Sequence, residues 1–229
     1  MLSITFVRHG NTDANQQRIL QGQTDTVLNE RGHRQAALVG ERFANQPFDK
    51  MYCSDLVRCK QTAQAIQDNN HQDTPITYLS SLRERGFGAL SGQPLKHLFS
   101  ESYRQNINAD DHVKAHGGET EQEFATRVID GYVAVVKEAV EAKYRHILIV
   151  THGGPLRSLC LWWTTRLSPA YDYNGDVDRL QRGHHGNTGV TKVRLDQGDP
   201  MQGVVELFSC LDHLKSLGSI DEKDMPPSV

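Results

Sequence analysis

The chain has 229 residues, with 25 lysine and arginine residues against 28 aspartate and glutamate residues, which gives a formal net charge of -3. This length is enough for one α/β domain with a well-buried core. The charge balance does not favour nucleic acid or an anionic membrane surface as a partner. A cationic site for an anionic ligand therefore has to be a local pocket.

The four cysteines predict free thiols. Cys53, Cys59, Cys160 and Cys210 form no Cys-x-x-Cys pair, and two of them lie in apolar segments. Reduced cysteines are typical of proteins in reducing compartments, so we expect a cytoplasmic protein. The chain begins directly with an apolar run and not with a basic region and signal-peptide core. No apolar run approaches the roughly 20 residues that cross a bilayer, so we expect no membrane partner.

The first 54 residues predict a strand, a loop, a helix and a second strand. The run Ser3 to Val7 is rich in β-branched and aromatic residues, which is typical of a buried strand. A polar loop, residues 11–28, leads to Asn29, the expected N-cap of a helix from Glu30 to about Ala44. Residues 50–53 predict the second strand. The residues expected on the inner side of the helix are Ala36, Ala37, Val39, Gly40 and Phe43.

The next segment predicts a second helix, a third strand and an irregular region. Ser54 or Asp55 is expected to cap a helix that runs to about Asp68. Residues 76–79 predict a short strand. Residues 86–118 mix glycine, proline, asparagine, aspartate and histidine with short helical pieces. This region is long for a passive connection, so we expect a lid-like insert that faces a ligand.

The C-terminal part continues the alternation. Thr120 is the expected N-cap of a helix from Glu121 to about Lys143, and residues 145–150 contain the continuous apolar run of a parallel strand covered on both faces. Residues 153–164 predict a further helix with Pro155 in its first turn. The segments 189–195 and 204–209 alternate as paired strands do. The expected apolar positions of the long helix are Phe124, Val128, Tyr132, Val135, Val136 and Val140.

Arg8, His9 and Gly10 follow the first predicted strand directly. In open α/β sheets, ligands bind at the carboxyl ends of the strands. A neutral imidazole is a good nucleophile, a guanidinium matches phosphate oxygens, and a glycine lets a ligand approach the backbone. The tripeptide favours phosphoryl transfer through a phosphohistidine. The alternative is a chance turn sequence, since average residue usage predicts this tripeptide in about one or two of a hundred chains of this size.

A second histidine repeats this arrangement. The apolar run Ile147 to Val150 is followed by Thr151, His152 and Gly153. If the two strands pack side by side, His9 and His152 face each other at the mouth of the sheet. A capped turn histidine is the alternative for His152 taken alone.

Two charged segments between these histidines contain further candidates for the same site. Arg58 is predicted in the first turn of a helix, where a basic residue is unfavourable against the helix dipole, and a bound phosphate would explain its position. Glu84 lies between Arg83 and Arg85. Taken alone, this charged triplet is also compatible with a surface ion-pair cluster.

In this order, the motifs resemble the histidine phosphatase superfamily, also called the phosphoglycerate mutase-like family. The resemblance covers essentially the whole chain, and it implies a three-layer α/β/α sandwich on a mostly parallel sheet, which matches the predicted alternation. The motifs that carry it are residues 7–12, Asn15, Gln21-Gly22, residues 28–32, residues 54–63, residues 82–85, residues 117–120 and residues 150–153.

The resemblance also implies roles for individual residues. His9 is the implied nucleophile, and Glu84 matches the acid/base carboxylate of the family. Arg8, Arg58 and His152 are implied to hold the transferring phosphoryl group. The residues expected to bind substrate are Asn15, Gln21, Gly22, Gln23 and Gly153.

Two departures from the family's mutases favour hydrolysis over mutase activity. Those mutases carry an adjacent arginine pair in the insert after the acid/base motif, whereas residues 86–118 contain only single basic residues here. Phe87 stands where the mutases have tyrosine. Residues 82–88 and 210–214 resemble the TIGAR-type fructose-2,6-bisphosphatases. The expected substrate is therefore a sugar bisphosphate or a phosphoglycerate-type metabolite. A cofactor-dependent phosphoglycerate mutase and a catalytically weak phosphate- or protein-binding relative are the alternatives.

We expect one domain over residues 1–215, with about 86–118 as the lid-like insert and 216–229 as a polar C-terminal tail, in a monomer or homodimer. The expected partner is a small phosphorylated metabolite, with no nucleic acid. We expect no cofactor and no metal, because the sequence offers no acidic cluster with ligand spacing. His184 and His185 are expected to be surface residues and not ligands.

Overall fold

The computed structural model describes residues 1–165, 170–196 and 198–217. It contains a seven-stranded sheet in the order β3-β2-β4-β1-β6-β7-β5. The neighbouring pairs β1–β4, β2–β4, β2–β3 and β5–β7 are parallel, whereas β1–β6 and β6–β7 are antiparallel. The strands are β1 (Leu2–Arg8), β2 (Lys50–Ser54), β3 (Ile76–Leu79), β4 (His146–Thr151), β5 (Ala170–Tyr173), β6 (Val190–Leu195) and β7 (Gln202–Cys210).

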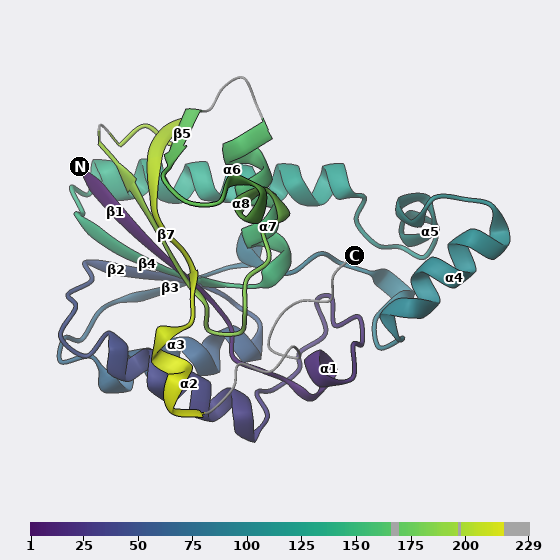
Figure 1. Ribbon diagram of the computed structural model, residues 1–229, viewed down its shortest axis with the longest axis horizontal. Coiled ribbons are helices and arrows are strands. Elements are labelled where there is room, and N and C mark those ends of the chain that lie inside the picture. The colour runs from purple at the N-terminus through teal and green to yellow at the C-terminus, as the bar shows by residue number, and fades with distance from the viewer. Residues whose placement is uncertain (166–169, 197, 218–229) are drawn as a thin grey trace.

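Helices cover both faces of this sheet (Figure 1). One layer contains α2 (Glu30–Arg42) and α3 (Val57–Asn69), and the other contains α6 (Glu121–Glu141) and α7 (Gly153–Thr165). The predicted three-layer α/β/α sandwich on a mostly parallel sheet is therefore confirmed. The shorter helices are α1 (Asp13–Gln16), α4 (Leu95–Gln105), α5 (Ala109–Ala115) and α8 (Val177–Arg182), with 3-10 turns at Ser80–Leu82, Gly88–Leu90 and Asp212–Leu217.

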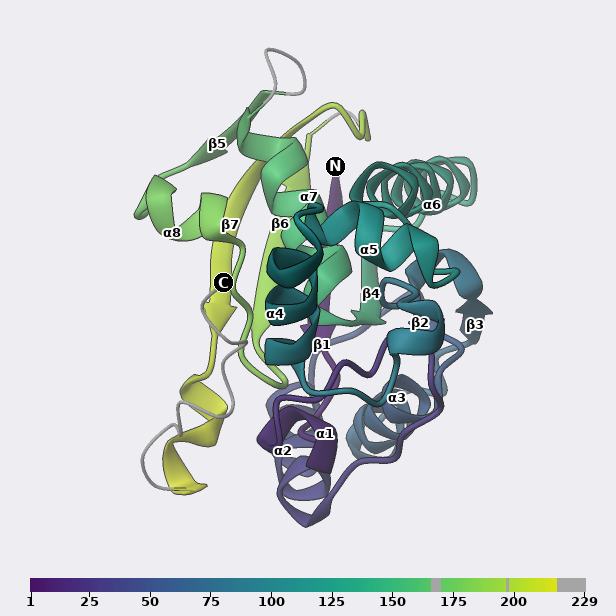
Figure 2. The ribbon, with the colours of Figure 1, turned by 90° about the vertical axis from the view of Figure 1, so that its right-hand side faces the viewer.

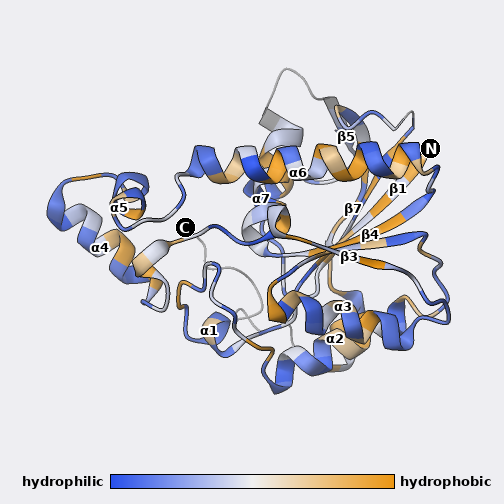
Figure 3. Ribbon diagram, turned by 180° about the vertical axis from the view of Figure 1, so that it is seen from behind, coloured by the Kyte–Doolittle hydropathy of each residue, from blue (hydrophilic) through white to orange (hydrophobic). Residues whose placement is uncertain are grey.

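Strand β4 shows why two helical layers form. Ile147 and Ile149 belong to the apolar cluster under α6 and α7, whereas Leu148 and Val150 belong to the cluster under α2 and α3. Because side chains alternate along a strand, a continuous apolar run needs cover on both faces. The apolar strands accordingly lie between helices whose outer sides are hydrophilic (Figure 3).

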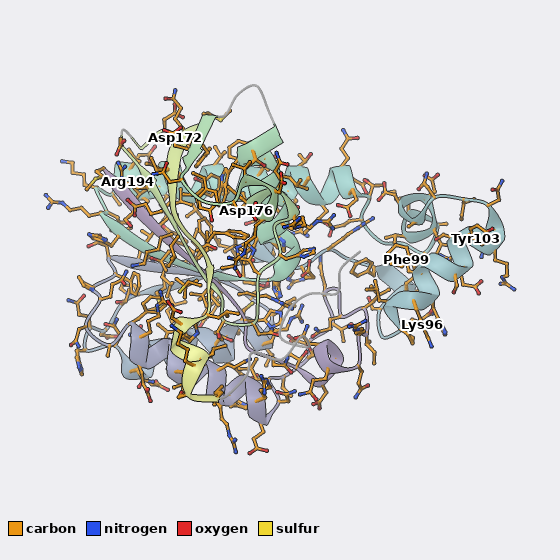
Figure 4. All side chains as sticks on the ribbon, viewed as in Figure 1. Lys96, Phe99, Tyr103, Asp172, Asp176 and Arg194 are labelled. Carbon is orange, nitrogen blue, oxygen red and sulfur yellow. The ribbon has the colours of Figure 1, made fainter. Side chains whose placement is uncertain are left out.

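Residues 86–118 stand beside the edge at which β1 and β4 end (Figures 1 and 2). Their two helices, α4 and α5, share a small apolar cluster formed by Leu20, Leu90, Leu98 and Val113. Phe99 and Tyr103 on α4 are exposed (Figure 4). Closure of this segment over a ligand stays a prediction.

Three local expectations were wrong. Neither Ser54 nor Asp55 caps the second helix: α3 begins at Val57 after the non-capping Leu56, and the Val57 amide donates instead to Asp25 Oδ1, 2.7 Å away. Ala37 in α2 and Val140 in α6 are exposed, while the neighbouring Gln35 and Ala139 are buried. Gln35 is buried because its Oε1 accepts the Asn11 amide at 2.9 Å.

Strand β5 and helix α8 were not predicted from the sequence. The polar tail expected from residue 216 begins within the last 3-10 turn, and from residue 218 onward it lies outside the described residues. In the described part of the chain, no helix combines the length and apolar character that a membrane crossing needs.

We expect Gly40→Ala to lower the free energy of unfolding by about 1–3 kcal/mol, because overpacking strains a dense interior. A Cβ atom at position 40 would lie 2.5 Å from the Ala65 carbonyl oxygen, so α2 and α3 would have to separate. An ordinary Gly→Ala change in a helix has the opposite sign. Urea denaturation measures the change, with Arg34→Ala on the exposed side of α2 as a control. A more stable Gly40→Ala protein would contradict the packing argument.

Candidate active site

The pairing of β1 with β4 brings the two histidines together. Arg8 and Thr151 are register partners at the ends of these strands, so His9 and His152 leave the sheet side by side. Their ring centroids are 5.1 Å apart, and the His9 amide donates to the Thr151 carbonyl at 2.9 Å. Both side chains are buried.

The His9 ring has one proton and one free lone pair. Its Nδ1 lies 2.7 Å from the Gly10 carbonyl oxygen, which only accepts, so Nδ1 carries the hydrogen and Nε2 is bare. Burial, followed by the charges of Arg58 and Arg8, holds the pKa of His9 well below its usual range, although the Gly10 hydrogen bond opposes this. His9 is thus a neutral imidazole with an unprotonated Nε2.

Arg58 is a fully buried cation near the start of α3. Its Nη1 donates to the Thr24 carbonyl and its Nη2 to the Gly22 carbonyl, both at 2.8 Å. Within the described ranges it pairs with no carboxylate. A buried charge held only by neutral acceptors attracts an anion strongly, because the low-dielectric surroundings screen it poorly.

His152 lies behind Arg58. Its Nδ1 accepts from Arg58 Nε at 3.1 Å, so Nε2 carries the hydrogen and donates to Ser54 Oγ at 2.8 Å. Burial and the Arg58 charge hold the pKa of His152 well below its usual range. The adjacent Cys59 thiol lies 3.4 Å from Nε2, and burial raises its pKa to about 12, so it stays protonated.

Glu84 approaches the start of α7. Its Oε2 accepts the Gly154 amide at 3.1 Å, and its Oε1 accepts the Arg85 amide at 2.9 Å. A carboxylate at a helix N-terminus is favourable because the helix dipole is positive there. A side chain at position 154 would overlap the Glu84 carboxylate, so a glycine is needed for this close approach.

The flanking arginines do not pair with Glu84. Arg83 binds Asp55 at 2.6 Å, and Arg85 binds Asp110 and Glu121. The triplet at 83–85 is therefore not a simple surface cluster. Its two cations are held by other carboxylates, and the Glu84 carboxylate faces the site.

Arg127 and Glu119 hold the segment that carries Glu84. The Arg127 guanidinium binds both Glu119 oxygens, at 2.7 and 2.8 Å, and also donates to the Arg83 and Glu84 carbonyls at 3.1 and 3.2 Å. Glu119 Oε2 accepts the Gly86 amide at 2.7 Å. This network fixes the backbone on both sides of the Glu84 carbonyl.

The C-terminal segment supports Arg8 from the other side. The Thr188 amide donates to the Arg8 carbonyl at 3.0 Å, and Thr188 Oγ1 lies 3.1 Å from His213 Nε2. Arg42 Nη1 in turn lies 3.2 Å from His213 Nδ1. Through His213, the segment that follows β7 thereby contacts the residues that support Arg8.

A cavity of about 240 Å³ opens at this edge of the sheet. Most of the predicted site residues line it, whereas His152 and Gln23 do not. The Gln23 amide donates instead to the Glu84 carbonyl at 3.3 Å. The predicted residues on the cavity wall are Arg8, His9, Asn15, Gln21, Gly22, Arg58, Glu84 and Gly153.

Several lining residues were not predicted from the sequence, among them Arg18, Leu95 and Arg157. For Arg157 the sequence offered one signal: it follows Gly153 by about one helical turn, so the two residues lie on the same side of the helix. The surface expectation was wrong for His185, which is fully buried, and its carbonyl accepts from Arg8 Nη1 at 2.7 Å. His184 lines the cavity. No group of three or more histidine, cysteine, aspartate or glutamate side chains in the described residues is arranged to hold a metal ion.

The model of the histidine phosphatase superfamily (branch 1) matches residues 4–205. A broad-specificity phosphatase of Saccharomyces cerevisiae is 32% identical over 71% of this chain and 70% of its own length. The fructose-2,6-bisphosphatase TIGAR of Xenopus tropicalis is 37% identical over 61% of this chain, and the match spans 51% of that relative.

Among solved structures, a phosphoglycerate mutase from Bacillus anthracis str. Sterne superimposes with a TM-score of 0.76. The alignment covers 93% of this chain and 95% of that one, at 21% identity. At this level of identity, the likeness supports the fold alone.

We expect the free energy of unfolding to fall as the pH drops below about 6.5. Burial lowers the pKa of His185 to about 4, and the pKa values of His9 and His152 are lowered in the same direction. Between the two pKa values the unfolded chain binds a proton that the folded protein does not, so stability is complete above pH 6.5 and decreases toward pH 4. His185 alone accounts for about 3 kcal/mol over this window.

Urea denaturation at pH 7, 6 and 5 measures this slope. The variant His185→Asn is expected to show a shallower slope than the wild type, and His71→Asn, at an exposed position, an unchanged one. Equal slopes for the wild type and His185→Asn would show that His185 does not titrate as its burial requires.

Proposed function

We propose that this chain, which belongs to the histidine phosphatase superfamily, hydrolyses phosphate monoesters of small metabolites through a phosphohistidine on His9. The observation that carries the proposal is the bare Nε2 of a neutral His9 in a cavity that Arg8 and Arg58 also line. A neutral nucleophile is not repelled by a phosphate dianion. The two guanidiniums meet the charge that develops on the equatorial oxygens, which is usually the largest contribution to catalysis.

The first half of the reaction forms the phosphoenzyme. Nε2 of His9 attacks phosphorus while the bond to the leaving oxygen breaks. Glu84, in its protonated form, donates a proton to that oxygen, and the alcohol leaves. The Gly10 carbonyl accepts from Nδ1 and stabilises the positive charge that develops on the ring.

The second half returns the enzyme to its starting state. The Glu84 carboxylate accepts a proton from water, whose oxygen attacks phosphorus as the phosphorus–nitrogen bond breaks. Inorganic phosphate leaves, and Glu84 is protonated again. Arg8 and Arg58 supply the positive charge at both steps. His152 acts as a positioning residue, because it contacts the His9 ring and holds Arg58 through Nε.

Hydrolysis is favoured over mutase activity by the placement of the basic side chains in residues 86–118. Arg104 pairs with Glu101, and Lys114 pairs with Glu123. Lys96 is exposed on α4, away from the cavity lining (Figure 4). The mutases of the family carry an arginine pair in this insert, whereas none of these three basic side chains of residues 86–118 lines the cavity.

The proposed substrate is a sugar bisphosphate or a phosphoglycerate-type metabolite. The named activity of the TIGAR relative, a fructose-2,6-bisphosphatase, favours a sugar bisphosphate. We also propose a cytoplasmic location, because all four cysteines are free thiols. Residues 1–215 are proposed to act as one domain, in which Phe87 and Leu95 of the 86–118 segment form part of the outer cavity wall.

The first test is phosphate release from a panel. It contains fructose-2,6-bisphosphate, fructose-1,6-bisphosphate, 2,3-bisphosphoglycerate, phosphoenolpyruvate, 3-phosphoglycerate and p-nitrophenyl phosphate, with a chelator present. We expect His9→Ala to lower kcat by at least about 1,000-fold, since loss of a nucleophile removes the covalent route. His71→Ala, at an exposed histidine, is the control.

Rapid quenching with labelled substrate should trap an acid-labile phosphoenzyme in the wild type and none in His9→Ala. Equal turnover by the wild type and His9→Ala would exclude the phosphohistidine route. Absence of release from every member of the panel would instead favour a phosphate- or protein-binding relative that has lost turnover.

We expect Arg127→Ala to lower kcat by about 10- to 100-fold with little change in KM, because a small displacement of Glu84 is costly while the phosphate-binding arginines stay in place. Arg104→Ala, which breaks an exposed ion pair, is the matched control. Circular dichroism establishes that each variant is folded at the assay temperature. An unchanged kcat in folded Arg127→Ala would mean that the network does not position Glu84.

A further inference from the structure

The turn formed by residues 186–189 holds the backbone that carries Arg8 and His9. The Thr188 amide donates to the Arg8 carbonyl at 3.0 Å. The Asn187 side chain donates through Nδ2 to the His9 carbonyl, also at 3.0 Å. A displacement of this turn would therefore move the proposed nucleophile and a phosphate-binding arginine together.

Thr188 has a backbone conformation that threonine rarely adopts. It is the third residue of the turn, which is closed by the Gly189 amide donating to the Gly186 carbonyl at 2.9 Å, and its φ is +57°. Glycine or asparagine is the usual residue at a turn position with positive φ, whereas a β-branched residue there is strained. Such a conformation persists only where the surroundings hold it. The contacts of the Thr188 side chain therefore show what holds the turn.

His213 provides one of these contacts, and the position of its hydrogen follows from its neighbours. Arg42 Nη1 lies 3.2 Å from His213 Nδ1, and a guanidinium only donates, so Nδ1 accepts and Nε2 carries the hydrogen. This Nε2 lies 3.1 Å from Thr188 Oγ1, whose own hydrogen is donated to the Asn187 carbonyl at 2.7 Å. His213 therefore donates to Thr188, and both sides of the ring require the same tautomer.

The segment that carries His213 keeps the ring neutral and in place. Burial, followed by the Arg42 charge, lowers the pKa of His213 to about 4, although Asp212 opposes this, so the ring carries one hydrogen at neutral pH. The adjacent Leu214 is buried, and its amide donates to the Leu211 carbonyl at 2.8 Å. His213 thus projects from an anchored 3-10 turn, which contacts α2 (Figure 1).

We propose that His213 is a positioning residue for phosphoryl transfer, which acts by holding Thr188 in its left-handed conformation. The turn in that conformation sets the position of Arg8 and His9. This inference rests on the proposed phosphatase function and extends the site to the segment that follows the last strand. His213 does not line the cavity, so its effect has to pass through the turn.

The first test removes the hydrogen bond from His213. We expect His213→Ala to lower kcat/KM about 10- to 100-fold, because a small displacement of a nucleophile is costly. The loss should appear in both kcat and KM, since His9 and Arg8 move together, and it should be similar on fructose-2,6-bisphosphate and p-nitrophenyl phosphate. Lys215→Ala, which breaks an exposed ion pair in the same 3-10 turn, is the matched control.

Two further variants separate the hydrogen bond from the packing of the ring. His213→Phe keeps an aromatic ring without a donor, so it should show the same loss, and it replaces His213→Ala if that variant does not fold. His213→Gln has an amide nitrogen that can donate to Thr188, so it should recover most of the activity. Circular dichroism and urea denaturation establish which variants are folded under the assay conditions.

A change in the turn itself tests the route of the effect. Glycine adopts a positive φ without a steric penalty, so a turn with Thr188→Gly does not need the hydrogen bond from His213. Residues that act through one contact are not additive. In the Thr188→Gly background, adding His213→Ala should therefore lower kcat/KM by less than about 3-fold.

An unchanged kcat/KM in folded His213→Ala would overturn the proposal, even if the variant is less stable. The same loss from His213→Ala in the wild-type and Thr188→Gly backgrounds would also overturn it, because the effect would not pass through the turn.

Orthovanadate, which resembles the transferring phosphoryl group, provides a measurement that needs no turnover. We expect His213→Ala to raise its Kd, measured by calorimetry, about 10-fold, because Arg8 is displaced. If the wild type releases phosphate from no substrate, the phosphatase function fails, and the vanadate Kd still tests the positioning role. An equal Kd for the wild type and His213→Ala, or no binding by either protein, would overturn that role.

Discussion

Arg58 brings a positive charge into the interior at the edge where β1 and β4 end, and neutral groups hold it there. Carbonyls of the 22–26 loop accept from its Nη atoms, and His152 accepts from Nε. Burial is the main reason why the pKa values of His9 and His152 are lowered, and the Arg58 charge adds to it, because protonating either ring would place two cations together. Loop position, histidine protonation and anion affinity thus all involve this one guanidinium. The phosphate of the proposed substrate would balance this charge, which has no carboxylate partner among the described residues.

Different parts of the fold hold the two groups that the proposed reaction needs, the nucleophile and the acid/base carboxylate. His9, the proposed nucleophile, follows β1, and its amide donates to the Thr151 carbonyl in β4. Glu84, the proposed acid/base carboxylate, lies in a loop that Arg127 and Glu119 hold against α6. Because the supports are independent, damage to the loop network should change proton transfer without removing the phosphate-binding charges. The outer cavity wall adds a third region, which Arg18 and Arg157 line.

Much of the fold followed from local sequence patterns. The apolar run in β4 and the cap at Asn29 depend on neighbouring residues, so the strand and the start of α2 were predictable. The start of α3 was not, because its first amide binds Asp25 from a distant loop. Ala37 was misplaced because helical spacing defines a stripe only to about one residue, and the Gln35–Asn11 hydrogen bond decides which position is buried. Strand β5 and helix α8 are short and carry little periodic signal.

By itself, the sequence determined which chemistry the protein carries: an arginine and a histidine behind one buried strand, a histidine behind another, and Arg58 and Glu84 in turns between them. These residue types limit the reaction because their side chains have intrinsic charge and nucleophilicity. Only the tertiary structure decided which nitrogen of the His9 and His152 rings carries the hydrogen. It also decided that Arg157 and His184 line the cavity, whereas His152 and Gln23 do not. Those properties arise from burial and from contacts between distant segments, such as those of His152 with Arg58 and Ser54 and that of Gln23 with Glu84, which local spacing does not encode.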